Sequence, residues 1–371
     1  MATIDLLSKP INRRRFLALT GSAAAVGAVA ATCQGAGEYD IPPGSGRATW
    51  EAGKAQVQAQ QNAAASATAV AGASSDHSAP MPTGEGRPKP SGELAAVYDA
   101  TLPPLDPNPV KDLVIEVIDK EVEVAAGIML DAWTYDGVLP GKVVHVKQGD
   151  TINFTLRNGG DTAHSIDFHS ARTPWDKNYI TILPDEDLSF TWTADYPGVY
   201  MYHCGTGPVL HHIANGMYGA VVVDPPTPFA PAKEFVLVQS EFYLSEGENG
   251  LWKTDLDRAL AVQPDFVVFN GAANQYQQET LKAAPGELIR LYVMNAGPTL
   301  FSAFHVIGTI FDKVYVDGNP ANAMTGISTW TIPPGGGATF ELVIPEAGQY
   351  PFVTHSFAYT GLGAVGLLEI A

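Results

Sequence analysis

Apolar and polar residues alternate in short stretches from about residue 106 to the end of the chain. Such alternation is typical of strands that bury one face, because successive side chains of a strand point to opposite sides. The clearest alternating triplets are Ile152, Phe154 and Leu156; Leu188, Phe190 and Trp192; Ile289, Leu291 and Val293; and Phe340, Leu342 and Ile344. Gly, Pro, Asn and Asp separate these stretches, and helix-period stretches are scarce. The pattern predicts an all-β fold, a sandwich or a barrel.

The same region contains an internal repeat. Segments 149–152, 158–164, 196–204 and 216–221 recur as 286–289, 295–305, 346–355 and 361–365, respectively. The second copy has no Cys, and Leu362 stands near the position that Met217 has in the first copy. We therefore predict two tandem domains of one β-fold, residues 105–226 and 227–371, joined near residues 225–231.

The first 33 residues have the pattern of an export signal. A basic segment, residues 12–17, contains Arg13-Arg14-Arg15-Phe16-Leu17 and precedes an Ala-rich apolar run that ends at Ala31. The Arg pair followed by Phe-Leu favours a twin-arginine signal over an ordinary Sec signal, and the run is short for a transmembrane helix. Cys33 is a candidate acylation site, with simple cleavage as the alternative. We expect a periplasmic protein or one at the outer face of the cytoplasmic membrane.

Residues 34–104 differ in composition from both neighbours. They are rich in Ala, Gly, Ser, Pro and Gln and contain few large apolar residues. Such a segment buries too little surface to offset the entropy lost on ordering. We predict a disordered linker between the signal and the folded domains.

Charge and cysteine content exclude two classes of protein. The formal net charge is −18, from 39 acidic and 21 basic residues, which argues against a nucleic-acid partner and favours a partner with a basic patch. The two cysteines, Cys33 and Cys204, lie in the signal and in the first domain, so a disulfide framework is not expected. Cys204 is then either a buried small residue or a thiolate ligand.

Four residues of the first domain form the ligand set of a blue-copper electron-transfer site. They are His164, Cys204, His212 and Met217. Two imidazoles, a thiolate and a thioether suit both oxidation states of copper. Each residue alone has an ordinary structural interpretation, but the ordered set is much more specific. We expect the four side chains to converge on one point.

A second metal site is predicted on the other side of the same strand. His203 precedes Cys204, and adjacent strand residues point to opposite faces. His169 lies five residues after His164 and can join His203. Two imidazoles and a third ligand with an open position would form a catalytic copper site, and the His203–Cys204 peptide would connect the two metals.

From about residue 105 to Ala371 the chain resembles the copper nitrite reductase family. The matching motifs are His164-Ser165-Ile166-Asp167-Phe168-His169, His203-Cys204 with His212 and Met217, Phe304-His305-Val306-Ile307-Gly308, and Thr354-His355. The resemblance implies two Greek-key cupredoxin domains with one type 1 and one type 2 copper per chain. It assigns type 1 copper to His164, Cys204, His212 and Met217, and type 2 copper to His169, His203 and His355. It further implies a homotrimer in which His355 reaches the type 2 copper of an adjacent subunit.

The resemblance also implies the reaction and its catalytic residues. Nitrite is reduced to nitric oxide and water with one electron and two protons, in the context of denitrification. Asp167 and His305 match the family's proton-donating pair, and Ile307 matches its apolar residue over the substrate. The expected electron donor is a small cupredoxin or a cytochrome c.

Some residues depart from the family pattern. The Cys204–His212 loop is about one residue short, and His211 stands where an aromatic residue is frequent, either at a donor-docking rim or simply exposed. His145 is assigned no role. A two-domain multicopper oxidase is one alternative, but the chain has no His-x-His and Gly205 follows Cys204. A non-enzymatic cupredoxin electron carrier is the other, and would bind one copper instead of two.

Overall fold

The alternating stretches form strands in the computed structural model, which describes residues 86–371. The strands of the first half are β1 (Val110–Ala125), β2 (Ile128–Tyr135), β3 (Gly141–Lys147), β4 (Thr151–Asn158), β5 (Asp167–Phe168), β6 (Asp187–Thr193), β7 (Gly198–His203) and β8 (Tyr218–Asp224). Two short helices, α4 (Trp175–Asn178) and α5 (Val209–Ala214), interrupt them. The predicted signal, Cys33 and linker residues 34–85 lie outside the described residues.

The second half repeats this order with additions. Its strands are β9 (Lys233–Phe242), β10 (Leu244–Glu246), β11 (Trp252–Thr254), β12 (Phe266–Phe269), β13 (Leu281–Ala283), β14 (Leu288–Gly297), β15 (Ser302–Val306), β16 (Phe311–Val316), β17 (Ala323–Ile327), β18 (Trp330–Ile332), β19 (Gly337–Val343), β20 (Gly348–Thr354) and β21 (Val365–Ile370). The helical segments are α6 (Leu256–Leu260), α7 (Gln275–Gln278), η1 (Pro320–Asn322) and α8 (Phe357–Thr360).

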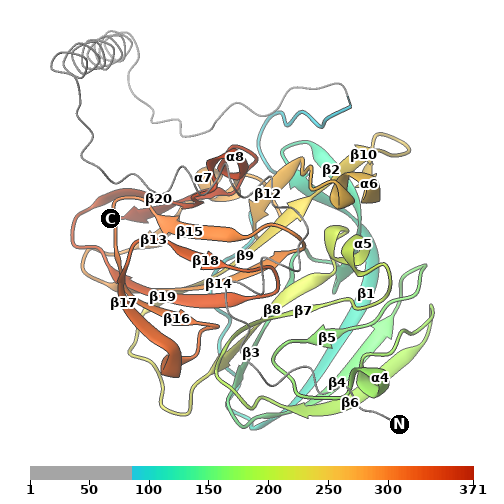
Figure 1. Cartoon of the computed structure of the whole chain (residues 1–371), viewed down its shortest axis with the longest axis horizontal. Coiled ribbons are helices and arrows are strands. Elements are labelled where there is room, and N and C mark those ends of the chain that lie inside the picture. Colours follow the sequence, from blue (N-terminus) through green and yellow to red (C-terminus); the bar gives the residue numbers. More distant parts are fainter. Residues whose placement is uncertain (1–85) are drawn as a thin grey trace, which may run out of the picture. The chain divides into compact units, whose positions relative to one another are not determined.

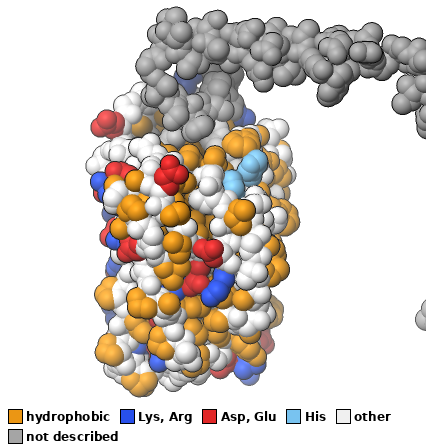
Figure 2. All heavy atoms as spheres, turned by 90° about the vertical axis from the view of Figure 1, so that its left-hand side faces the viewer, with side chains coloured by type: hydrophobic (Ala, Val, Ile, Leu, Met, Phe, Trp, Pro, Cys, Tyr) orange, Lys and Arg blue, Asp and Glu red, His pale blue; other side chains and the backbone are white. Residues whose placement is uncertain are grey.

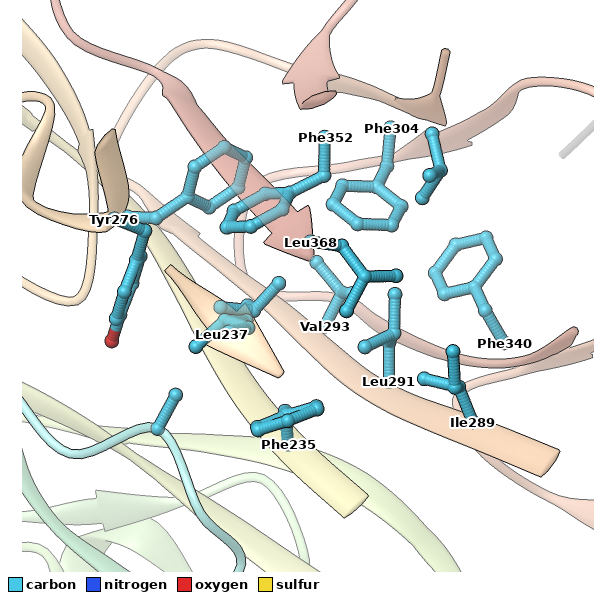
Figure 3. Close-up of a cluster of buried hydrophobic side chains, with 14 of the residues drawn as sticks. Phe235, Leu237, Tyr276, Ile289, Leu291, Val293, Phe304, Phe340, Phe352 and Leu368 are labelled. Atoms are coloured by element: carbon cyan, nitrogen blue, oxygen red, sulfur yellow. The ribbon is translucent and has the colours of Figure 1, made fainter. Parts of the chain in front are cut away.

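Each repeat is a sandwich of two sheets (Figure 1). In the first domain, the sheet β2-β1-β4-β6 packs on the sheet β3-β8-β7-β5. In the second, β12-β9-β14-β19-β16-β17 packs on β13-β21-β20-β15-β18. Alternate residues of each strand fill the space between the sheets, and aromatic rings such as Phe304, Phe340 and Phe352 dominate the second core (Figure 3). The all-β prediction with two cupredoxin-like domains is confirmed.

The two domains share a third apolar core. It is formed by residues of β7 and β8 from the first domain and of β9 and β14 from the second, among them Met201, Val222, Val238 and Met294. These strands are therefore buried on both faces. In addition, β10 and β11 extend the first domain's sheet, since Trp252 pairs with Leu130. The predicted boundary at residue 226 separates the repeats along the chain, but a segment of the second half completes a sheet of the first.

The predicted linker ends earlier than residue 104. Residues 86–104 lie in extended conformation along both domains, with Leu94 7% and Ala100 3% exposed. Backbone bonds join this segment to β9, because Val236 N donates to Ala100 O over 2.7 Å and Leu102 N to Glu234 O over 3.3 Å. The linker prediction is wrong for this stretch, since main-chain pairing orders it despite its few apolar side chains. We call residues 86–108 the strap.

The surface is mixed in character on the face that Figure 2 shows. Acidic and basic side chains are scattered among apolar ones there, with no concentrated patch of one charge. Within residues 86–371, no helix is long and apolar enough to span a membrane.

Candidate metal centres

The first cluster lies at the end of β7, inside the first domain. His164 Nδ1 is 3.2 Å from His212 Nδ1, and Cys204 Sγ is 3.3 Å from His212 Nδ1 and 4.0 Å from His164 Nδ1. These donor atoms all lie within 4.8 Å of one another. The structure thus brings together three of the four residues that the sequence predicts as type 1 ligands.

Met217 joins this cluster through the backbone. Cys204 N donates to Met217 O over 3.1 Å, and Met217 N donates to His212 O over 3.1 Å. The loop from Cys204 to Met217 is therefore closed on itself, with α5 carrying His212. Met217 is 0% exposed, so its thioether faces the interior of the domain.

Burial keeps the two imidazoles of this cluster neutral. His164 is 0% and His212 5% exposed. Desolvation, with a further contribution from the neighbouring imidazole, lowers the pKa of His164 to about 4. Desolvation and the proximity of His211 likewise lower the pKa of His212 to about 4. Neutral imidazoles beside a cysteine sulfur are a donor set that fits copper.

The second cluster lies on the opposite side of the same strand end. His203 Nε2 is 3.1 Å from His169 Nε2 and 3.8 Å from Asp167 Oδ2. Asp167 and His203 face each other across the β5–β7 pair. The adjacent residues His203 and Cys204 thus serve different clusters, as the alternation of strand side chains predicts.

Carbonyl groups hold the Nδ1 atoms of both imidazoles in the second cluster. His169 Nδ1 lies 3.0 Å from Gly335 O, and His203 Nδ1 lies 2.9 Å from Cys204 O. A carbonyl can only accept, so each Nδ1 carries the proton. Burial lowers the pKa of His203, so this ring is neutral. The two Nε2 atoms point toward each other, 3.1 Å apart, where a metal ion would bind both imidazoles.

The remaining predicted residues lie together in the second domain. His305 on β15 and His355 after β20 have ring centroids 5.5 Å apart, and His355 is exposed. His305 Nδ1 lies 2.5 Å from Ser328 O, so Nδ1 carries a proton and Nε2 is the other ring nitrogen. Ile307, in the turn that follows β15, is half-buried. Among the described residues, His355 is not part of the Asp167–His169–His203 group.

The structure corrects the alignment of the two repeats. His164 pairs with Ile182 as Ser302 pairs with Ile332, and Asp167 pairs with His203 as His305 pairs with Val353. The bond from Cys204 N to Met217 O has its counterpart in the bond from Thr354 N to Ala364 O, 3.3 Å. Ala364, not Leu362, therefore occupies the place of Met217. His305 is the counterpart of Asp167, not of His164.

Three contributors were not found from the sequence. Ser165 N lies 3.4 Å from Cys204 Sγ, and the Ser165 hydroxyl accepts from Gly205 N over 3.0 Å. Gly335 holds His169, and its φ of +77° with a Cβ position 3.0 Å from the imidazole favours glycine there. Trp133 packs its indole on both imidazoles of the first cluster. The glycine run 335–337 and the serine beside a ligand were the only sequence signals.

Both repeats match known families of copper proteins. Two family models described as multicopper oxidase match residues 116–228 and 233–364, one for each repeat. A copper-containing nitrite reductase of Neisseria meningitidis serogroup B is 38% identical over 76% of this chain and 76% of its own length. The corresponding protein of Neisseria gonorrhoeae is 39% identical over 69% of this chain and 67% of its own.

Solved structures give the same result. The copper nitrite reductase of Nitrosomonas europaea has a TM-score of 0.66 and 37% identity, covering 71% of this chain and 94% of that one. A Cu-containing nitrite reductase of Thermus scotoductus has a TM-score of 0.66 and 31% identity over 71% of this chain and 62% of that one. A multicopper oxidase is 26% identical with a TM-score of 0.63.

Proposed function

Because the chain belongs to the copper-containing nitrite reductase family, we propose how its two residue clusters divide the copper-dependent reduction of nitrite to nitric oxide. The reaction takes up one electron and two protons and releases nitric oxide and water. The observation that carries the proposal is the pair of histidine clusters on either side of the His203–Cys204 peptide, with inward-facing donor atoms in each. One cluster is buried and the other is open, which suits an electron-transfer site and a substrate site.

The buried cluster is the electron site. His164, Cys204, His212 and Met217 would hold a type 1 copper, one per chain. The backbone bonds that close the Cys204–Met217 loop, and the hydrogen bond from Ser165 N to the sulfur, keep these donors in place when the charge changes. Little rearrangement is then needed on electron transfer.

The open cluster is the substrate site. His169 and His203 would hold a type 2 copper, one per chain, and each imidazole is oriented by a carbonyl on its Nδ1. We propose that the partner subunit's His355 supplies the third imidazole in a homotrimer. The exposure of His355 and its separation from the His169–His203 group in the described chain support this assignment.

Two protein groups deliver the protons. When bound, copper supplies the electron through the buried site and a Lewis acid for nitrite at the open one. The Asp167 carboxyl, 3.8 Å from His203 Nε2, holds one proton beside the substrate position. The partner subunit's His305 holds the second on its Nε2, because in each chain His305 lies beside His355 and its Nδ1 faces Ser328 O. Both protons end on the oxygen that leaves as water.

The partner subunit's Ile307 supplies the apolar wall of the site. It follows His305 by two residues and is half-buried. An apolar side chain beside the nitrite position offers no hydrogen bond, so it restricts the orientation of the anion by shape alone.

Location and donor follow from the charge and the leader. We propose export through the twin-arginine signal to the periplasm, with Cys33 as a site for a lipid anchor. The net charge of −18 favours a small cupredoxin or cytochrome c that presents a basic patch. Replacing Arg13, Arg14 and Arg15 by Lys should leave the protein in the cytoplasm, which cell fractionation measures.

The decisive experiment is nitric oxide release by the copper-loaded protein, given nitrite and an artificial reductant under anoxia. We expect two coppers per chain, a blue absorption band, and a rate that falls about 10²- to 10⁴-fold in Asp167→Asn without loss of the band. A His203→Ala variant should retain the blue copper and lose the second.

The outcomes separate the alternatives. Blue protein with two coppers but unchanged turnover in Asp167→Asn would remove Asp167 as a proton donor. A wild-type protein with one copper and no nitric oxide would contradict the proposed substrate site. Sedimentation of a monomer that still holds two coppers per chain would contradict the shared role of His355.

A further inference from the structure

Trp133, on β2, lies against both imidazoles of the buried cluster. Its ring centroid is 5.3 Å from that of His164 and 4.8 Å from that of His212. A third imidazole, His211, lies 5.1 Å from the same indole, while the His211 and His212 rings are 6.4 Å apart. The indole therefore contacts three imidazoles: His164 and His212 of the cluster, and His211 beside them.

The exposure of these side chains makes the indole a cap. His164, Cys204 and Met217 are 0% exposed, and His212 is 5% exposed. Trp133 itself is half-buried, so this residue contacts solvent as well as the cluster. Because Trp133 contacts both imidazoles and also solvent, it separates the buried cluster from water.

The backbone holds this cap in register with the cluster. Trp133 N donates to Asn215 O over 3.1 Å, in the loop between α5 and β8. At Gly216, φ is +115° and a Cβ would lie 2.9 Å from Trp133 O, so glycine permits this close approach. The loop that carries His212 and Met217 is thus fastened to the strand that carries the indole.

The second repeat shows that the scaffold itself does not need a tryptophan here. Val267 N donates to Leu362 O over 3.2 Å, the counterpart of the bond from Trp133 to Asn215. Val267 is 0% exposed, so a valine fits the equivalent strand position in a fully packed core. The large ring occurs in the repeat that has the histidine and cysteine cluster.

We propose that Trp133 is a positioning residue that excludes water from the buried cluster and thereby keeps the midpoint potential of its copper high. This inference rests on the proposed function, in which His164, Cys204, His212 and Met217 hold a type 1 copper. The oxidised centre carries one more positive charge than the reduced centre. Water stabilises the more charged form, so a dry surrounding favours reduction.

The test compares Trp133→Val, which copies the second repeat, with Trp133→Phe in the copper-loaded full chain. The blue band is titrated against redox mediators to give the midpoint potential, and copper content is measured for each variant. We expect both variants to retain the band, with a lower potential in Trp133→Val and an intermediate one in Trp133→Phe. Trp175→Val, at a side chain that is 75% exposed on α4, is the matched control and should leave the potential unchanged.

A water-sensitive measurement distinguishes a cap from a residue that only packs. Pulsed electron paramagnetic resonance in heavy water should detect exchangeable deuterons near the copper in Trp133→Val and fewer in the wild type. The proposal would be overturned if Trp133→Val had the same midpoint potential and the same deuteron signal as the wild type. If Trp133→Val does not fold, the same result in Trp133→Phe would overturn it. A wild-type protein without a blue band would instead contradict the proposed electron site, independently of Trp133.

Discussion

The two repeats share a set of backbone bonds but differ in the side chains that those bonds present. In the first repeat the bonded positions include His164, Cys204, His212 and Met217. In the second they are Ser302, Thr354, Tyr359 and Ala364, and the loop closes with the same two bonds, from Thr354 N to Ala364 O (3.3 Å) and from Ala364 N to Tyr359 O (3.4 Å). The turn glycines correspond as well, with φ of +115° at Gly216 and +118° at Gly363.

This difference shows that the conformation of the loop does not depend on the residues proposed here as type 1 copper ligands. A hydroxyl can replace the sulfur in the scaffold, since Ala303 N donates to Thr354 Oγ1 as Ser165 N does to Cys204 Sγ. The main chain thus forms the same loop in both repeats, whichever side chains it carries. Ligand substitutions copied from the second repeat should therefore change the chemistry and preserve the fold.

The largest expected effect comes from exchanging the sulfur for the hydroxyl of the other repeat. In Cys204→Thr we expect loss of the blue band and of nitric oxide formation below detection, because no thiolate remains to hold the copper. Unfolding by urea should stay cooperative, since Thr354 occupies the same position in the second repeat.

The reciprocal exchange is the control. Thr354→Cys should give no blue band, because Ser302, Tyr359 and Ala364 provide no imidazole or thioether. A coloured Thr354→Cys protein would mean that the sulfur alone, not the set of four side chains, determines the site.

The next effect concerns Asp167 and His305, which occupy equivalent positions in the two repeats. In His305→Gln we expect nitric oxide formation to fall about 10²- to 10⁴-fold, because the second proton loses its donor. The blue band should be unchanged, since His305 is outside the buried cluster. His145→Gln also removes an imidazole, but from neither cluster, and should retain full turnover. Loss of the band in His305→Gln would mean that the division between the two clusters is wrong.

A third comparison concerns the outer sheet of each domain. In the first domain, the exposed Thr191 hydroxyl donates to Asn153 across β4 and β6. At the equivalent place on β14 and β19 of the second domain, Arg290 and Glu341 form an ion pair at 2.6 Å, and Arg290 is 1% exposed. Because the second sheet is covered there, Arg290→Met should cost roughly 3 kcal/mol, since the Glu341 carboxylate loses its ion pair with Arg290 and keeps only Lys313 at 3.6 Å and the hydroxyl of Tyr315. Thr191→Ala should cost about 0.5–1.5 kcal/mol. Urea unfolding measures both.

The control is the variant that removes both charges. Arg290→Met combined with Glu341→Leu should be less destabilised than Arg290→Met alone. An equal or greater loss in the double variant would mean that packing of the Arg290 side chain on Phe229, 4.5 Å from the guanidinium to the ring, dominates the effect.

The fold class and the cluster residues could be predicted from the sequence because they depend on local patterns. Alternation in 152–156 and 289–293 specifies strands, and the opposite facing of His203 and Cys204 follows from strand geometry. Both clusters were predicted from parity and residue type.

Other features could not be predicted, because they depend on contacts between distant segments. Trp133 contacts His212 although it precedes it by 79 residues in the chain. The strap is ordered by main-chain bonds to β9 that composition does not reveal. The misalignment of the repeats arose because His305 resembles His164 in type while matching Asp167 in position.

The smallest expected effect concerns His145, whose counterpart in the second repeat is the exposed Lys282. His145 is covered by the strap, with Nδ1 2.6 Å from Pro103 O and Nε2 3.2 Å from Asp224 Oδ2. Both ring nitrogens face acceptors, so the doubly protonated imidazole fits best. Burial alone would lower the pKa of His145, but Asp224 and the Pro103 carbonyl outweigh it, with Glu234 adding to them, and raise it.

The sign of the pH dependence follows from that shift. A pKa raised above the ordinary value of about 6.5 stabilises the folded state fully below that pH, and this contribution is lost as the pH rises through the folded-state pKa. Wild type should therefore exceed His145→Gln in its urea midpoint at about pH 5.5, by an amount equivalent to roughly 1 kcal/mol or less, and the difference should shrink by about pH 9. Lys282→Gln should give no such pH-dependent difference, because its side chain is exposed. A difference for His145→Gln that is constant across this range would mean that the imidazole holds the strap as a neutral ring.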